Sequence, residues 1–214
     1  MTLHHTVSII GGFMGGYTIF NHCDIFANAQ TGNLIKLVLN ACSGNLGSIG
    51  FMFLSFLIYA AGNVFYSVFR RYSRLSMKIV SLIITSIAIV LVGILSAVAN
   101  SFIAILPLAF AMPVQWNAFK TAGGNSSATT FSSNNIRQAV ILLTTYIMDK
   151  DKKALRNSRF YWATLLCFHL GVAASCLLSL VFGVQSIWFC FIFVALSSAA
   201  YYRYQTAKIR AFGK

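Results

Sequence analysis

Residues 30–36 read Gln-Thr-Gly-Asn-Leu-Ile-Lys, and residues 131–137 read Phe-Ser-Ser-Asn-Asn-Ile-Arg, in an otherwise apolar chain. Each stretch is a short polar segment that contains Asn and is followed by Ile and one basic residue. An offset of 101 aligns Asn33 with Asn134 and also aligns the two cations. A duplicated polar break with a duplicated cation is typical of a site built by two halves of a membrane protein.

The composition assigns the chain to a membrane. Its 214 residues are 58% hydrophobic and only 9% charged, and the mean hydropathy is +0.76. A soluble domain has about 25% charged residues, so this chain lacks the charge to cover a water-facing surface. The net charge of +13 is typical of nucleic-acid binding, but the basic residues form short clusters between long apolar runs. We therefore expect the lipid bilayer as a partner and no nucleic acid.

The apolar segments predict an all-α polytopic fold. A helix needs about 20 apolar residues to cross the hydrocarbon core. Six segments are long enough, at 6–27, 48–69, 79–99, 102–120, 160–182 and 186–203. Two further helices, 32–43 and 133–148, are too short or too polar to cross alone and begin at the repeated stretches. The prediction is six transmembrane helices plus two short re-entrant or broken helices.

The basic residues predict the orientation. All but two of the 16 Lys and Arg residues fall in connections that can share one side, namely 70–78, 120, 150–159 and the segment from 203 onward. The connections around 43–48, 100–101 and 183–185 contain none. The positive-inside rule then makes both termini cytoplasmic. Three spans per half is an odd number, so we expect a 3+3 inverted repeat, with residues 1–100 as the first half and 101–214 as the second.

Three sequence pieces resemble the YoaK family of bacterial integral membrane proteins. They are Gly11-Gly12-Phe13, the stretch 26–33 reading Phe-Ala-Asn-Ala-Gln-Thr-Gly-Asn, and 115–118 reading Gln-Trp-Asn-Ala. The similarity covers nearly the whole chain. It implies a multi-pass protein of the bacterial cell membrane with transport as an expected activity, and it supplies no substrate. The chain departs from the family where 14–16 read Met-Gly-Gly instead of carrying an acid, and at Ser132-Ser133, where the family tends to have Thr-Gly.

The two polar breaks contain the candidate substrate site. Their side chains can cap the free amides of the short helices, whose N-termini then point to the middle of the protein and favour an anion or a carboxylate. Lys36 and Arg137 would strengthen that field, although both cations could instead extend to lipid headgroups. The candidates at the breaks are Thr31, Gly32, Asn33, Lys36, Ser132, Ser133, Asn134, Asn135 and Arg137.

Four further polar residues are candidates. Asp24 is the one acid outside the cytoplasmic loop 149–151; a charge at mid-bilayer costs about 3 kcal/mol, so Asp24 should find a cation and could couple transport to protons. It could also cap a helix end at the outer interface. His22 could relay the proton or be a structural histidine with satisfied partners. Gln115 and Asn117 could face the cavity or join helices.

These features favour a carrier for a small, anionic or carboxylate-bearing solute, bound between the broken helices near the bilayer midplane. A pore is the related alternative, and an accessory or assembly subunit without transport is another. An enzyme is disfavoured, because the membrane segments offer no carboxylate pair, no nucleophile with a base and no metal-ligand spacing. We expect no cofactor and no metal. A chain of 23.5 kDa leaves little room around a central cavity, which is compatible with a homodimer.

Overall fold

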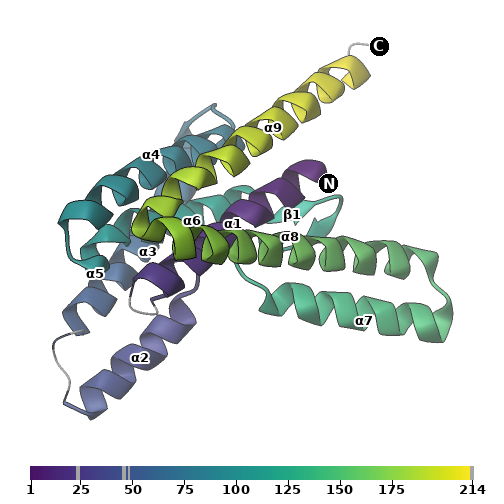
Figure 1. The fold of residues 1–214 in the computed structure, drawn as a ribbon. Helices are drawn as coiled ribbons and strands as arrows, with labels where there is room; N and C mark the ends of the chain where they lie inside the picture. Colours follow the sequence, from purple (N-terminus) through teal and green to yellow (C-terminus); the bar gives the residue numbers. More distant parts are fainter. Residues whose placement is uncertain (23–24, 45–46, 48, 213–214) are drawn as a thin grey trace.

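The computed structural model describes residues 1–22, 25–44, 47 and 49–212, and this part of the chain is almost entirely helical (Figure 1). The all-α prediction is confirmed, with one two-stranded hairpin added. The elements are α1 (Thr2–Asn21), α2 (Gln30–Cys42), α3 (Ile49–Tyr72), α4 (Met77–Val98), α5 (Ser101–Ala104), α6 (Leu106–Ala118), β1 (Thr121–Ala122), β2 (Asn125–Ser126), α7 (Ser133–Asp149), α8 (Lys152–Phe182), the 3-10 helix η2 (Gly183–Phe189) and α9 (Cys190–Phe212).

Four helical stretches of the described chain are long and apolar enough to cross a membrane. They are Ile49–Tyr72, Met77–Val98, Ser101–Ala118 and the continuous Lys152–Ala207, which contains α8, η2 and most of α9. Helix α1 is not among them. Its side chains are buried along most of its length, so protein rather than lipid surrounds it and its Gly-rich composition need not match the hydrocarbon. The molecule is thus an α-helical protein of the membrane class.

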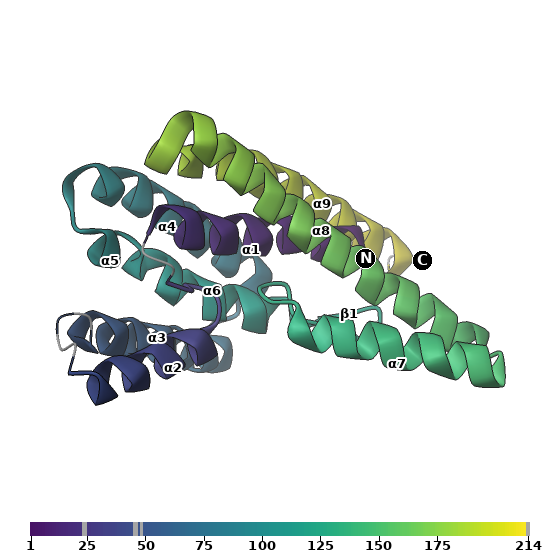
Figure 2. The ribbon, with the colours of Figure 1, turned by 60° about the horizontal axis from the view of Figure 1, so that its bottom comes forward.

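The helices pack in two groups (Figures 1 and 2). Helix α1 contacts α8 and α9, whereas α6 contacts α3 and α4. The short helix α2 packs against α3, and α7 packs against α8. From the middle of the molecule α2 runs towards the lower left of Figure 1 and α7 towards the lower right, so the two short helices diverge.

Glycines allow the closest helix contacts. A Cβ on Gly171 of α8 would lie 2.1 Å from the Ile9 carbonyl oxygen of α1. A Cβ on Gly62 of α3 would lie 2.5 Å from the Phe110 carbonyl oxygen of α6. Both distances are too short for any side chain, so these glycines are required for backbone-to-backbone packing.

The helix ends meet in two clusters. At one end the Lys78 ammonium at the start of α4 lies over the Phe119 ring after α6 and over the Tyr204 ring of α9. We call this the basic end, after Lys78. The start of α1 lies there too, since Met1 and Leu3 line the same cavity as Lys78. At the other end the Tyr17 hydroxyl of α1 donates to the Val184 carbonyl of η2 and lies 3.2 Å from the Ser96 hydroxyl of α4.

The structure differs from the expected elements at three places. The first span was expected to reach residue 27, but α1 ends at Asn21 and the chain turns back. The span expected at 102–120 is divided at Ile105 into α5 and α6, where Pro107 occupies the first turn of α6. The Gly-Gly pair between β1 and β2 forms a tight turn, with φ of 56° at Gly123 and 82° at Gly124, values that favour glycine.

Candidate functional site

Two asparagines hold the chain that precedes the two short helices. The Asn33 side chain accepts a hydrogen bond from the Phe26 backbone N–H at 3.0 Å and donates to the Phe26 carbonyl at 2.7 Å. The Asn135 side chain accepts from the Ala128 N–H at 3.2 Å and donates to the Ala128 carbonyl at 2.7 Å. Each side-chain amide thus pairs with both backbone groups, N–H and carbonyl, of the residue seven positions earlier in the chain. Both asparagine side chains are buried. We call these two arrangements the asparagine clamps.

The clamps correct the alignment of the repeated stretches. The residue that acts like Asn33 is Asn135, at an offset of 102, whereas the sequence alignment had paired Asn33 with Asn134. Asn134 is half-buried, and its side-chain oxygen accepts from the Arg137 guanidinium at 3.3 Å. Matching the residue letters could not decide the helical register, because two asparagines stand side by side there.

The expected capping of the short helices was wrong. Helix α2 has Ala29 as its N-cap and α7 has Ser132, and neither N-cap makes a side-chain hydrogen bond to the helix. The Asn33 and Asn135 amides are turned to the preceding loops instead. Thr31 and Ser133 are exposed, and Gly32 packs against the Phe26 ring. The first amides of α2 and α7 therefore lack the side-chain acceptor that an N-cap usually supplies.

The loops before α2 and α7 cross one face of α1. The Gln115 side chain of α6 donates to the Val7 carbonyl at 3.3 Å. A Cβ on Gly11 would strike the Thr129 carbonyl at 2.0 Å, and one on Gly15 would strike the Asn28 amide at 2.5 Å. Residues 7, 11 and 15 are successive turns of one helix face, so the polar groups extend over about 12 Å of α1. Asn28 also donates to the Thr130 carbonyl at 2.6 Å, which joins the loops.

Several buried polar atoms at this place have no hydrogen-bond partner among the described residues. They are Asn28 Oδ1, Gln30 Nε2, Gln115 Oε1, Thr129 Oγ1 and Thr130 Oγ1. All five residues are more than nine-tenths buried. A buried polar atom without a partner costs about 1–3 kcal/mol, so a group of them indicates that water or a ligand supplies the missing bonds. We call this group, together with Asn33 and Asn135, the polar crossing.

The two basic candidates lie outside the polar crossing. Lys36 is half-buried on α2, and its ammonium lies 5.8 Å from the centre of the Phe26 ring. Arg137 is exposed on α7 beside Asn134. Because these side chains sit one turn into their helices, they contribute charge around the crossing without lining it.

The remaining candidates separate into different roles. Gln115 is buried in the polar crossing. Asn117 joins two helices, since it donates to the Asn63 side chain of α3 at 2.8 Å. His22 is buried at the end of α1, with Nε2 within 3.2 Å of the Tyr17 hydroxyl and 3.3 Å of the Ser96 hydroxyl. Asp24, the acidic candidate, lies outside the described residues.

A chain of hydrogen bonds that the sequence did not suggest connects the second clamp to the start of α1. Ser127 donates to the Asn135 side-chain oxygen at 2.9 Å, so the His4 Nε2, 3.0 Å from the Ser127 oxygen, must be the donor of that pair. His4 precedes the segment 6–27 that was expected to span the membrane. Burial is the main cause that lowers its pKa to about 3, assisted by the neighbouring His5. His4 is therefore neutral at physiological pH, and these hydrogen bonds link uncharged side chains.

The sequence also did not identify Asn28, Gln30, Thr129 and Thr130 as site residues. The signal was available, because Asn28 and Thr130 are separated by the same 102 residues as the clamps. Within the described ranges, no three His, Cys, Asp or Glu side chains lie where they could hold a metal ion. Hydrogen-bonding groups, rather than metal ligands, define the site.

The comparisons with known proteins identify one family. A family model described as "Protein of unknown function (DUF1275)" matches residues 3–200. No curated protein and no solved structure matches the chain. The resemblance to the YoaK family is confirmed, because that family and DUF1275 are the same.

Proposed function

The chain belongs to the DUF1275 family, and we propose that it is a membrane carrier for a small anionic or carboxylate-bearing solute that binds at the polar crossing. The observation that carries the proposal is the group of buried polar atoms without partners where two interrupted segments meet on α1. A scaffold would gain nothing from leaving such groups unpaired, because each one lowers the stability of the fold.

An inverted 3+3 repeat of six spans with two re-entrant helices is part of this proposal. In the proposed repeat, α1 is equivalent to α6, α2 to α7, α3 to α8 and α4 to α9. When each helix is replaced by its equivalent, each main contact between two helices becomes a contact that is also observed. For example, α1 with α8 becomes α6 with α3. The glycines agree, since Gly62 faces the Phe110 carbonyl and Gly171 faces the Ile9 carbonyl. The two clamps agree as well. In such carriers the substrate site lies between the repeats, and one repeat moves against the other.

The charge around the crossing supports an anion as the solute. The helices α2 and α7 both begin there, and neither N-cap residue makes a side-chain hydrogen bond within the described part of the chain, so we propose that their first N–H groups and positive dipole ends bind the anion. Lys36 and Arg137 add positive charge one turn away. Asp24 is the one acid of the sequence outside the loop 149–151, and in the proposal we keep for it the role of proton-coupling group, together with His22 two residues earlier in the sequence.

We further propose that the protein lies in the bacterial cell membrane and that both termini are cytoplasmic. The start of α1, Lys78 and Tyr204 lie together at the basic end, which agrees with the positive-inside rule.

Uptake into proteoliposomes tests the proposal, with radiolabelled acetate, lactate, succinate and inorganic phosphate as probes. Wild-type protein should take up at least one of them above the level of protein-free liposomes. The double variant Asn33→Leu/Asn135→Leu should lose uptake. The matched control is Asn134→Leu, which changes the adjacent asparagine outside the clamp and should retain uptake.

A second variant separates a lost site from a lost fold. The hydroxyls of Thr129 and Thr130 have no hydrogen-bond partner among the described residues, so Thr129→Val and Thr130→Val keep the shape and should leave the melting temperature unchanged or higher. Uptake should nevertheless fall, by roughly tenfold if one solute hydrogen bond to a charged group is lost. Uptake that persists in these variants, or a wild type that transports none of the four anions, contradicts the proposal and favours an accessory subunit.

A further inference from the structure

Two cavities lie side by side at the basic end, apart from the polar crossing. One, of about 490 Å³, opens between the first turns of α1 and the middle of α9. The other, of about 510 Å³, lies between the start of α1, the start of α4 and the β1–β2 turn. Met1, Leu3 and Tyr204 line both cavities and form the wall that the two cavities share.

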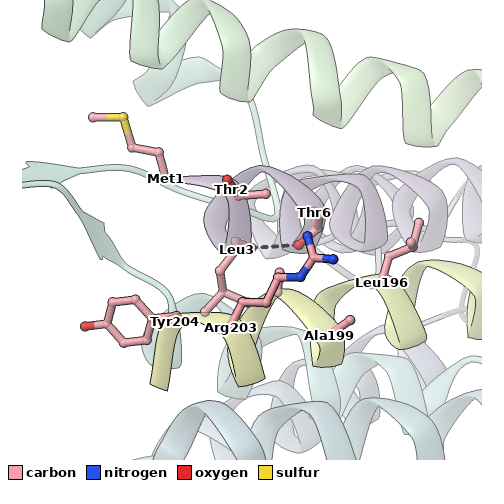
Figure 3. Close-up of a pocket in the computed structure, with 9 residues that line it drawn as sticks. Met1, Thr2, Leu3, Thr6, Leu196, Ala199, Arg203 and Tyr204 are labelled. Atoms are coloured by element: carbon pink, nitrogen blue, oxygen red, sulfur yellow. Dashed lines mark hydrogen bonds between the residues drawn. The ribbon is translucent and has the colours of Figure 1, made fainter. Parts of the chain in front are cut away.

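The first cavity has an apolar wall on α9 and a cation, the Arg203 guanidinium, which lies beside Thr6 (Figure 3). Leu196, Ala199 and Ala200 of α9 form its apolar wall, and Arg203 follows one turn later on the same helix face. In Figure 3 the Arg203 side chain extends along α1 towards Thr6. An apolar wall beside a guanidinium matches a molecule with a hydrocarbon chain and an anionic head.

The second cavity adds another cation at the same place. The Lys78 ammonium lies 5.1 Å from the centre of the Tyr204 ring and 5.9 Å from that of Phe119. These two rings hold the ammonium at the cavity by cation–π attraction. Arg203 is the chain neighbour of Tyr204, so both cations flank the shared wall.

No acid neutralises these charges within the described residues. The acids there are Asp149 and Asp151 at the turn between α7 and α8, and neither lines either cavity. Arg203 is exposed and Lys78 is half-buried, so both cations are accessible to an anion from outside the chain.

We propose that this pair of cavities is a binding site for an anionic phospholipid. The headgroup phosphate contacts Arg203 and Lys78, and one acyl chain lies along Leu196, Ala199 and Ala200. Lipid is the occupant that fits, because α9 belongs to the apolar stretch Lys152–Ala207 that is long enough to cross a membrane and the cavity opens beside it. The guanidinium pairs with phosphate in a forked geometry, and each such cation near an anionic headgroup strengthens binding about fivefold.

Native mass spectrometry of the full chain with dioleoyl phosphatidylglycerol tests this site, with the matched phosphatidylcholine as the neutral lipid. Phosphatidylglycerol should bind more tightly than phosphatidylcholine. Arg203→Gln and Lys78→Gln should each weaken phosphatidylglycerol binding about fivefold. The control Arg156→Gln removes an exposed cation of α8 that lines neither cavity, and it should leave binding unchanged.

Two further arms separate the sources of the anion. Ala199→Trp fills the first cavity at its apolar wall and should abolish the preference for phosphatidylglycerol while the melting temperature is retained. Inorganic phosphate, tested alone by thermal shift, should not stabilise the protein. Equal weakening in all three charge variants, unchanged binding in Ala199→Trp, or stabilisation by phosphate that depends on Arg203 and Lys78 would each overturn the lipid site.

Discussion

The two asparagine clamps have the same geometry but very different surroundings. Asn135 is connected through Ser127 to His4, and its helix α7 is fixed to α8 by a hydrogen bond from the Ser158 hydroxyl to the Ala139 carbonyl at 2.8 Å. Asn33 has one additional side-chain partner, Gln30, at 3.2 Å. Helix α2 meets α3 through a weaker contact, the Asn40 amide to the Met52 sulfur at 3.7 Å.

The difference indicates which half is fixed and which half can move. A segment held by a connected polar network opens less readily than one held by a single clamp. If the proposed carrier role holds, we therefore expect the segment with Asn135 to be the fixed wall of the polar crossing and the segment with Asn33 to move more readily. Motion of one repeat against the other is what alternating access requires.

The largest effects are expected at the two glycine contacts. Gly171→Ala places a Cβ 2.1 Å from a backbone oxygen, and Gly62→Ala places one 2.5 Å from a backbone oxygen. Both should destabilise the protein, by roughly 1–3 kcal/mol or more for overpacking, with Gly171→Ala the more severe. Thermal unfolding in detergent, with Gly50→Ala as control because nothing lies within 4 Å of its Cβ position, measures the order. A reversed order would contradict the tighter packing of α1 on α8.

Substitution of the two clamp asparagines should destabilise the protein by different amounts. Asn135→Leu leaves the Ala128 N–H and carbonyl and the Ser127 hydroxyl without Asn135, at a cost of about 3 kcal/mol. Asn33→Leu affects the Phe26 N–H and carbonyl, and should cost about 2 kcal/mol. Melting temperatures of the single variants test this, and Asn134→Leu should change little. If Asn134→Leu is as damaging as Asn135→Leu, the clamp assignment is wrong.

Hydrogen exchange sharpens the comparison between the loops. The amide of Phe26 should exchange faster than the amide of Ala128, although both donate to an asparagine side chain. The reason is that the second clamp opens only together with its network. Exchange followed by mass spectrometry in nanodiscs resolves the two loops. Equal protection would remove the argument that the first segment is the mobile one.

The smallest expected effect is on the pH dependence of the protein's stability. In the folded protein the pKa of His4 is lowered from its ordinary value of 6.5 to about 3, mainly by burial. Burial also lowers the pKa of His5. The unfolded chain thus binds more protons between these values, so stability should fall as the pH drops below about 6.5. His4→Gln should flatten the dependence of the melting temperature on pH between 6.5 and 5. A slope equal to that of wild type would show that His4 is not buried in neutral form.

The lengths of the apolar runs predicted the all-α class and the two short helices. The short helices expected at 32–43 and 133–148 are Gln30–Cys42 and Ser133–Asp149 in the structure. Apolar run length sets such boundaries, so a single sequence is sufficient to find them. The β1–β2 hairpin was missed, although a Gly-Gly pair between short polar segments is a known hairpin signal.

The site was predicted only in part, because its geometry depends on contacts far apart in the sequence. Asn33, Asn135 and Gln115 were identified as polar residues in an apolar context. Their partners were not, since nothing local to Asn33 indicates that its amide reaches back seven residues to Phe26 rather than forward to cap α2. Thr129 and Thr130 look like loop residues until the packing against Gly11 shows that they are buried.

Access of water to the polar crossing is the most direct test of the central claim. Thr130→Cys, in a background where the five native cysteines are replaced by Ala, would be treated with a membrane-impermeant thiosulfonate in reconstituted vesicles. The account predicts that the Thr130→Cys thiol reacts and that a transported anion protects it, whereas Ala139→Cys, buried between α7 and α8, does not react. A Thr130→Cys thiol that stays unreactive from both sides, with and without anion, would contradict a solute site at the crossing.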